Sequence, residues 1–343
     1  MQGFFDDKNK EYIIKDMKPR RPWLNYLWNE NVVCMSDQFG NGFSRMAIGT
    51  QRRDIENGVR NVYIRDRTTG EAYSATRNYG DLPFEVRETH VGINYQRVIS
   101  GYNGLEVIFT ICVPKDDAVV LYNVKIINKC GDNRLIDGYF CINPTPALSW
   151  HDAYGVADND ESLNGLLYRH DGFALPNDFT KVFVGCDKKY DAYDLSPAEF
   201  KGIYNGYENP TALKNEKLSC TGATFEAEYV AAFQFSDIFS KGNEFEATFC
   251  AFAARNVEEI KSLKKKYLED TTFGGELDKV HKENESEYNV FELNSPDIYL
   301  NSQTNIWLKR QTSLGKTWGR LYGKGASLAE RTAHPAGKQA GAA

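Results

Sequence analysis

The most suggestive local motif for chemistry is Gly315-Lys316-Thr317, which copies the end of a phosphate-binding loop. A complete loop of this kind needs a glycine five positions before the second one, so that backbone N–H groups can wrap the phosphates. Arg310 occupies that position, and no strand-like segment precedes it. The sequence therefore argues against a nucleotide site.

Histidines, cysteines and carboxylates do not form a recognisable catalytic or metal-binding motif either. No HxxxH, HExxH or GxSxG spacing is present, which argues against a metal site and a serine nucleophile. The seven cysteines are dispersed and lack CxxC spacing, as expected of free thiols in a reducing cytosol. With 47 Asp and Glu residues, no carboxylate pair can be singled out. We expect no cofactor and no metal. The histidines concerned are His90, His151, His170, His281 and His334.

The composition indicates a globular chain without a nucleic-acid or membrane partner. Its 343 residues are 41% hydrophobic and 26% charged, with a net charge of −6. The basic runs at 18–21 and 264–266 are too short to make a basic face for nucleic acid. The start has no secretory pattern, and no apolar run approaches the roughly 20 residues of a membrane span. We therefore expect a cytoplasmic protein.

The elements that must position any site read mainly as strands. The 13% aromatic content fits half-buried strands, and it is also compatible with stacking against sugar rings. Asn103-Gly104 between residues 95–99 and 105–113 predicts a hairpin. Residues 62–65 and 71–75 predict a second one.

Two later strand pairs are also expected. Residues 118–127 stop at the polar segment 128–133, and residues 135–142 are expected to return beside them. Residues 225–235 and 244–253 are expected to face each other, with one apolar face of the second run on a core. Many short strands at this spacing favour an antiparallel β-sandwich. The alternating core positions are Phe245, Ala247, Phe249 and Ala251.

Residues 150–220 read as irregular loops, which could carry a binding site or simply decorate the sandwich. From Asn256 onward the pattern becomes helical, with a capping box that ends at Glu259. A second helix is expected over 276–290. Pro296 is expected in the first turn of a third helix that runs to about Leu314.

The opening segment Gly3-Phe-Phe-Asp-Asp-Lys-Asn-Lys-Glu-Tyr-Ile-Ile14, followed by Arg21-Pro-Trp-Leu-Asn-Tyr-Leu27, resembles the cellobiose and chitobiose phosphorylases, family 94 of the glycoside hydrolases. The glycine-rich Asp37-Gln-Phe-Gly-Asn-Gly-Phe43 and the strand Val62-Tyr-Ile-Arg-Asp66 look like further motifs of that family. Trp318-Gly-Arg-Leu-Tyr-Gly-Lys-Gly325 resembles the entry to its catalytic barrel.

The resemblance implies a mainly β fold, a large antiparallel supersandwich like that of galactose mutarotase, followed by linker α-helices and an (α/α)₆ barrel. We expect the sandwich over 1–255, a helical linker over 256–295 and the start of the barrel over 296–325. Family members cleave a β-glycosidic bond with inorganic phosphate as co-substrate and release a sugar 1-phosphate with inverted configuration at the anomeric carbon. A barrel Asp protonates the leaving oxygen, so a single protein carboxylate suffices.

The chain departs from the family pattern after Gly325. The family continues there with an aromatic-Arg-Asp stretch, whereas Ala326-Ser327-Leu328 follows here. Residues 326–343 lack aromatic side chains and suggest an unstructured, foreign tail or a natural disordered one. We assign no catalytic residue. Only Arg320 carries over, as a donor-sugar residue, and an exposed Arg at a helix end is the alternative.

The leading hypothesis is thus the N-terminal carbohydrate-binding and assembly part of an inverting β-glycoside phosphorylase, truncated and inactive by itself. Its expected partners are an oligosaccharide and, in the full-length form, a second copy in a homodimer. The rival is a free-standing carbohydrate-binding module in which Trp23, Trp28 or Trp150 stacks on sugar. A glycosidase contained within the sandwich lacks any identifiable acid. We expect Trp23 to be a buried anchor rather than a sugar platform.

Overall fold

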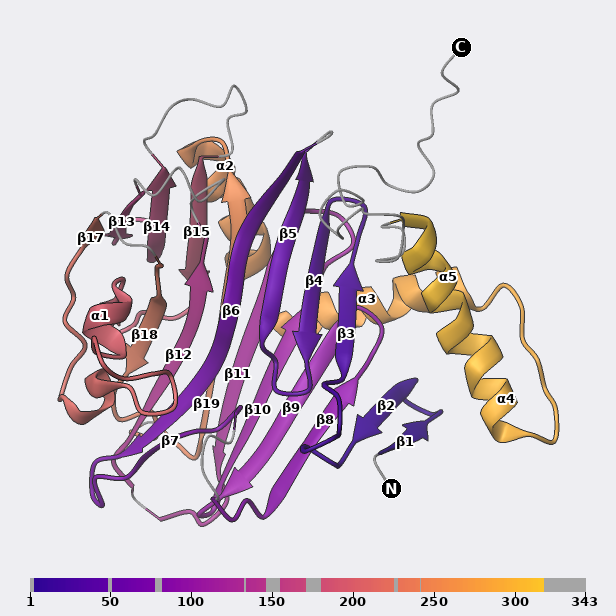
Figure 1. The fold of residues 1–343 in the computed structure, drawn as a ribbon, viewed down its shortest axis with the longest axis horizontal. Coiled ribbons are helices and arrows are strands. Elements are labelled where there is room, and N and C mark those ends of the chain that lie inside the picture. Colours follow the sequence, from indigo (N-terminus) through magenta and orange to yellow (C-terminus); the bar gives the residue numbers. More distant parts are fainter. Residues whose placement is uncertain are drawn as a thin grey trace.

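The computed structural model describes residues 3–48, 51–77, 82–132, 134–145, 155–170, 180–224, 228–240 and 242–317. Two antiparallel sheets stack face to face, and helices follow them in the chain (Figure 1). Within the described residues the larger sheet has eleven strands and the smaller one eight.

The larger sheet runs, in spatial order, through β1 (Gly3–Asp6), β2 (Glu11–Ile14), β8 (Val86–Val91), β9 (Tyr95–Tyr102), β10 (Leu105–Cys112), β11 (Val120–Asn128), β19 (Glu244–Ala254), β15 (Lys181–Cys186), β14 (Gly165–His170), β13 (Gly155–Asp160) and β17 (Ala223–Thr224). The smaller sheet runs through β16 (Ala192–Asp194), β18 (Ala231–Phe235), β12 (Ile136–Pro144), β6 (Gln51–Asp66), β5 (Gly42–Ile48), β4 (Val32–Asp37) and β3 (Leu24–Trp28), and β7 (Ala72–Ser74) pairs with β6.

Both predicted hairpins are present. Strands β9 and β10 pair directly across Asn103-Gly104, where both residues have positive φ, at 51° and 71°. A two-residue turn of this type needs that backbone conformation twice, which explains why Asn-Gly marks it. Strands β6 and β7 form the second hairpin.

The expected return of 135–142 beside 118–127 is wrong. Strand β11 pairs with β10 and β19 in the larger sheet, whereas β12 pairs with β6 and β18 in the smaller one. The Asn128 side chain accepts hydrogen bonds from the backbone N–H groups of Cys130 and Gly131, so the chain turns there and crosses to the other sheet. Both strands are almost fully buried. Two apolar strands can bury their side chains against each other by belonging to two stacked sheets as well as by pairing within one sheet.

Strands β18 and β19 do face each other, across the sandwich rather than within one sheet. The Phe233 and Phe249 rings lie 5.2 Å apart, and Phe249 lies 4.3 Å from Phe140 of β12. The predicted apolar face of β19 is confirmed, because Ala247, Phe249 and Ala251 belong to the core between the sheets. The opposite face is buried as well.

That opposite face of β19 is covered by the helices that follow it. Phe252 and Ala254 pack with Ile260 and Tyr267 in a second apolar cluster. Fully burying a side chain the size of Phe252 or Ile260 stabilises the fold by about 1.5–3 kcal/mol. Strand β19 is therefore covered on both sides. The covering elements are α2 (Val257–Lys264), the π-helical turn η2 (Lys265–Glu269) and α3 (Phe273–Tyr288).

The helix starts partly match their predicted positions. The Asn256 side chain accepts from the backbone N–H of Glu259 and caps α2 as predicted. Helix α3 begins at Phe273, earlier than expected, with Thr272 as its cap. Pro296 lies outside the third helix, because Asp297 is the cap and accepts from the N–H groups of the next turn. This helix runs through α4 (Ile298–Ser302), η3 (Gln303–Trp307) and α5 (Leu308–Thr317).

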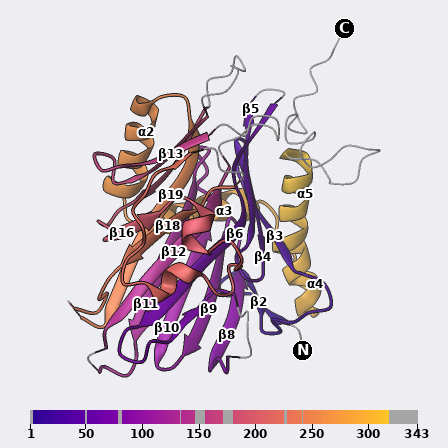
Figure 2. The ribbon, with the colours of Figure 1, turned by 60° about the vertical axis from the view of Figure 1, so that its left-hand side comes forward.

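The region expected to consist of loops is more regular than its sequence indicates. Residues 155–170 and 181–186 supply three neighbouring strands, β13, β14 and β15, of the larger sheet. Two short helical turns follow, α1 (Pro197–Phe200) and η1 (Thr211–Lys214). In Figure 2, α2 lies at one side of the sandwich and α4–α5 lies alongside β3 and β4 at the other.

Candidate functional site

Arg320, the one site residue carried over from the family resemblance, lies outside the described residues, as do Trp150, His151 and the tail 326–343. Two hollows are found where the N-terminal strands meet the C-terminal helices. We call them the polar cleft and the aromatic cleft.

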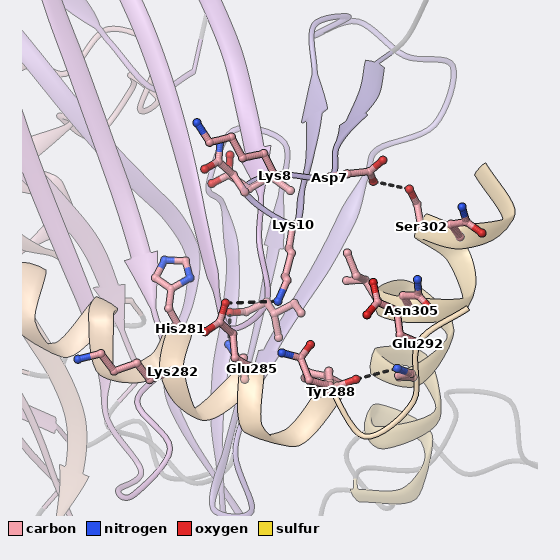
Figure 3. A pocket seen from close by; sticks show the side chains of 18 of the residues that line it. Asp7, Lys8, Lys10, His281, Lys282, Glu285, Tyr288, Glu292, Ser302 and Asn305 are labelled. Atoms are coloured by element: carbon pink, nitrogen blue, oxygen red, sulfur yellow. Dashed lines mark hydrogen bonds and ion pairs between the residues drawn. The ribbon is translucent and has the colours of Figure 1, made fainter. Parts of the chain in front are cut away.

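The polar cleft has a volume of about 1100 Å³ and lies between the turn after β1, the edge of the larger sheet, α3 and α4 (Figure 3). Charges of both signs line it, so it has no strong preference for an anion or a cation. The side chains labelled in Figure 3 are Asp7, Lys8, Lys10, His281, Lys282, Glu285, Tyr288, Glu292, Ser302 and Asn305.

Glu11 of β2 is the most heavily hydrogen-bonded carboxylate of this cleft. It lies 2.7 Å from His90 Nδ1 and accepts from the Tyr95 hydroxyl at 2.6 Å and from Arg97 Nη2 at 3.0 Å. Burial raises the pKa of Glu11, but these partners outweigh it and leave the pKa lowered. Glu11 is therefore held ionised, and its geometry does not suit a general acid.

His90 lies between two carboxylates. Its Nδ1 faces Glu11, and its Nε2 lies 2.9 Å from Glu88. Burial alone lowers the pKa of His90, but the hydrogen bonds to both carboxylates prevail and raise it. Burial lowers the pKa of His281, whose ring packs edge-on against Tyr95 with centroids 4.8 Å apart.

The remaining contacts of the polar cleft join the N-terminal turn to the helices. Asp7 accepts from the Ser302 hydroxyl, and Lys10 pairs with Glu285 at 3.4 Å (Figure 3). Asn284 donates to the backbone oxygen of Ile93 at 2.9 Å. These contacts make the polar cleft a structural junction, although Asn284 Oδ1 and the Tyr288 hydroxyl have no hydrogen-bond partner among the described residues.

The sequence contained no local signal for this cluster. Glu11 and His90 are distant along the chain and meet only because β2 pairs with β8, with Ile13 opposite His90. Such a register cannot be found from spacing. Among the described residues, no group of three or more His, Cys, Asp or Glu could hold a metal ion.

The aromatic cleft lies on the other side of α4–α5 and has a volume of about 390 Å³. Four aromatic side chains form a continuous series along it. The rings of Trp23 and Tyr12 are 5.3 Å apart, those of Tyr12 and Phe5 4.9 Å, and those of Phe5 and Trp307 6.0 Å. Arg310, three aliphatic side chains and five amide side chains also line the cleft, the amides being Asn25, Gln38, Gln96, Gln303 and Gln311.

The expectation that Trp23 is a buried anchor is wrong, because 36% of its surface is exposed. Its backbone N–H donates to Gln38 Oε1, and its indole leans on Tyr12 instead of entering the core. Among the described tryptophans the buried one is Trp28, which is 5% exposed and lies with its ring 5.3 Å from the Arg310 guanidinium. Trp28 is thus unavailable as a sugar platform.

Arg310 fastens α5 to β3. It is 4% exposed, and its Nη2 donates to Asn25 Oδ1 and to the backbone oxygen of Tyr26. The guanidinium also lies close to the rings of Trp307, one turn earlier, and Trp28, at 5.7 and 5.3 Å from their centroids. Burial lowers the pKa of Arg310 to about 10, so it stays charged at neutral pH. The residue that breaks the phosphate-loop motif is therefore a structural arginine.

The supersandwich-domain model of glycosyl hydrolase family 94 matches residues 10–270. The chain belongs to this family. The predicted membership and the predicted mainly β supersandwich are both confirmed.

Among curated relatives of this family 94 chain, N,N'-diacetylchitobiose phosphorylase of Vibrio furnissii is 23% identical over 93% of the chain and 41% of that protein. Solabiose phosphorylase of Paenibacillus borealis is 24% identical over 95% of the chain and 44% of that protein. The chain thus spans less than half the length of these relatives.

Among solved structures, an aldose epimerase homologue from C. elegans matches with a TM-score of 0.39 and 9% identity, over 68% of this chain and 99% of that one. Within the described part of the family 94 chain, no helix is both long and apolar enough to cross a membrane.

Proposed function

We propose that this chain is the carbohydrate-binding and assembly part of an inverting β-glycoside phosphorylase that acts in the cytoplasm as a homodimer. The family match over 10–270 is the observation that carries the proposal. Relatives that align with 93–95% of the chain are named N,N'-diacetylchitobiose phosphorylase and solabiose phosphorylase.

In the proposed reaction, inorganic phosphate attacks the anomeric carbon of a β-linked saccharide while a protein acid protonates the leaving oxygen. The products are an inverted sugar 1-phosphate and a shortened saccharide. We place the acid outside this chain. Arg320 would contact the donor sugar. The chain by itself would position its partner domain and perform no transfer.

The third helix supports the proposed assembly role. Its buried side is held by Arg310, but four large apolar side chains on α4 and α5 face solvent. Large apolar side chains exposed on one short helical segment mark a segment that packs on something else. Further helices of a barrel would cover these side chains, in keeping with a helical linker over 256–295 and the start of a barrel over 296–325. The exposed side chains are Ile298, Tyr299, Leu300 and Leu308.

An activity assay tests this proposal. Purified chain is incubated with phosphate and cellobiose, N,N'-diacetylchitobiose or laminaribiose, and released sugar 1-phosphate is measured. We expect none. Turnover at about 1 per second, a rate ordinary for enzymes, would show that the chain carries its own acid and would contradict the assembly role.

A further inference from the structure

The aromatic cleft contains two buried polar atoms without a partner. Asn25 Nδ2 and Arg310 Nε make no hydrogen bond among the described residues, although both side chains are only 4% exposed. Asn25 and Arg310 both line the cleft. Buried donors are normally satisfied, so an orphaned pair beside a cavity calls for an acceptor from outside.

Both orphaned atoms are N–H donors. The other hydrogen bonds of the same two side chains fix their positions, because Arg310 Nη2 donates to Asn25 Oδ1. A ligand that completes the site must therefore present oxygen acceptors to this end of the cleft. Hydroxyl groups meet this requirement, and they can also donate to amide oxygens such as those of the glutamines that line the cleft.

The walls of the cleft require an apolar ligand face. Trp23 and Trp307 mark the two ends of the aromatic series, and Trp23 remains partly open to solvent. A pyranose ring combines a flat C–H face with hydroxyls around its edge. The volume of about 390 Å³ lies at the small end of ligand sites and suits one sugar unit, with further units in solvent.

We propose that the aromatic cleft binds one unit of a β-linked saccharide, with Trp23 against the ring face and Asn25 and Arg310 donating to its oxygens. The choice of a β-linked sugar rests on the proposed function. This site lies between strands β1–β3 and helix α4–α5 and needs no catalytic acid. It would hold substrate chains close to the enzyme without cleaving them.

Equilibrium binding tests the proposal. The full chain is titrated without phosphate with cellobiose, laminaribiose and N,N'-diacetylchitobiose, by calorimetry and tryptophan fluorescence. We expect saturable binding of at least one sugar at one site. Trp23→Ala should weaken it at least tenfold, and Trp23→Phe should retain most of it. Tyr204→Ala is the matched control, because Tyr204 is a 98% exposed aromatic outside the cleft.

Unfolding curves of each variant show whether it still folds, and Trp23→Ala should still fold because about a third of Trp23 is exposed and its ring lies at a cleft instead of in the core. Absence of binding to all three sugars would overturn the proposal, as would binding that Trp23→Ala leaves unchanged or that Tyr204→Ala removes. Sugar 1-phosphate release is measured separately, so absence of binding would remove the proposed carbohydrate-binding role of this chain but leave its family membership and the proposed assembly role untouched.

Discussion

Removing the charge of Glu56 should destabilise the sandwich more than any nearby polar change. Glu56 and Arg60 of β6 are both fully buried between the sheets and form an ion pair. Glu56 Oε1 also accepts from the Ser44 hydroxyl at 2.5 Å and the Tyr122 hydroxyl at 3.2 Å. Glu56→Gln keeps the shape of the side chain but leaves the Arg60 cation without a counter-charge.

The expected cost follows from this geometry. Breaking one partner of a buried pair typically costs about 3–5 kcal/mol, because the remaining charge has lost access to water. Because 1.36 kcal/mol corresponds to a tenfold change, the equilibrium constant for unfolding should rise by a factor of about 10²–10⁴. With an unfolding entropy of about 2.1 cal/mol/K per residue over roughly 300 residues, the melting temperature should fall by about 5–8 °C. Tyr122→Phe, which removes only one hydrogen bond to Glu56, should cost about 1 kcal/mol.

A double variant separates charge from packing. Glu56→Leu with Arg60→Met removes both charges, so it should cost less than Glu56→Gln alone. It still costs something, since Arg60 also donates to the backbone oxygens of Met35 and Gly40, each at 3.0 Å. Urea unfolding followed by tryptophan fluorescence measures all the variants. A Glu56→Gln cost below 1 kcal/mol, or a double variant worse than the single one, would refute the reasoning.

Three further outcomes are expected. Burial raises the pKa of Asp194 to about 6, so the folded protein binds a proton there more readily than the unfolded chain and loses stability as pH rises from 3.8 through 6. Asp194→Asn removes this loss and should stabilise the protein by up to about 3 kcal/mol at pH 8 but not at pH 4. Denaturation curves at both pH values measure the difference. Because the pKa of His90 is raised in the folded protein, the stability gained from its protonated ring is complete below pH 6.5 and is lost as pH rises through the raised pKa. His90→Gln should therefore flatten the dependence of the unfolding free energy on pH in that range, and an unchanged slope would contradict this. Arg310→Ala should loosen α5 from β3, which faster hydrogen exchange over 298–317, with an unchanged rate in β10, would reveal.

Local signals predicted local structure well. Asn103-Gly104 and Asn256 each determine a turn or cap through their own backbone, so hairpin and helix start could be located from the sequence. Pairing partners could not. Strands β11 and β12 are adjacent in sequence but belong to different sheets. The sequence could not predict this, because an apolar pattern indicates that a strand face is buried but not which element buries it.

The candidate sites show the same limit. Trp23 and Trp28 lie in one short segment, yet about a third of Trp23 is exposed whereas Trp28 is buried. What distinguishes them is α5, which places Arg310 over Trp28 and leaves Trp23 beside a cleft. Only the long-range docking of that helix decides which indole is free, and spacing within 22–28 cannot report it.

The position of β19 has a consequence for synthesis of the chain. Strands β1, β2 and β8–β11 form one half of the larger sheet, and β13–β15 and β17 form the other. In the described part of the chain, only β19 joins the two halves. A ribosome that adds about 5–20 residues per second makes β19 on the order of ten seconds after β11. Until then the long inner edge of β11 stays unpaired and open to other nascent chains. A fragment that ends between Asn128 and Glu244 should therefore aggregate, however complete its hairpins are.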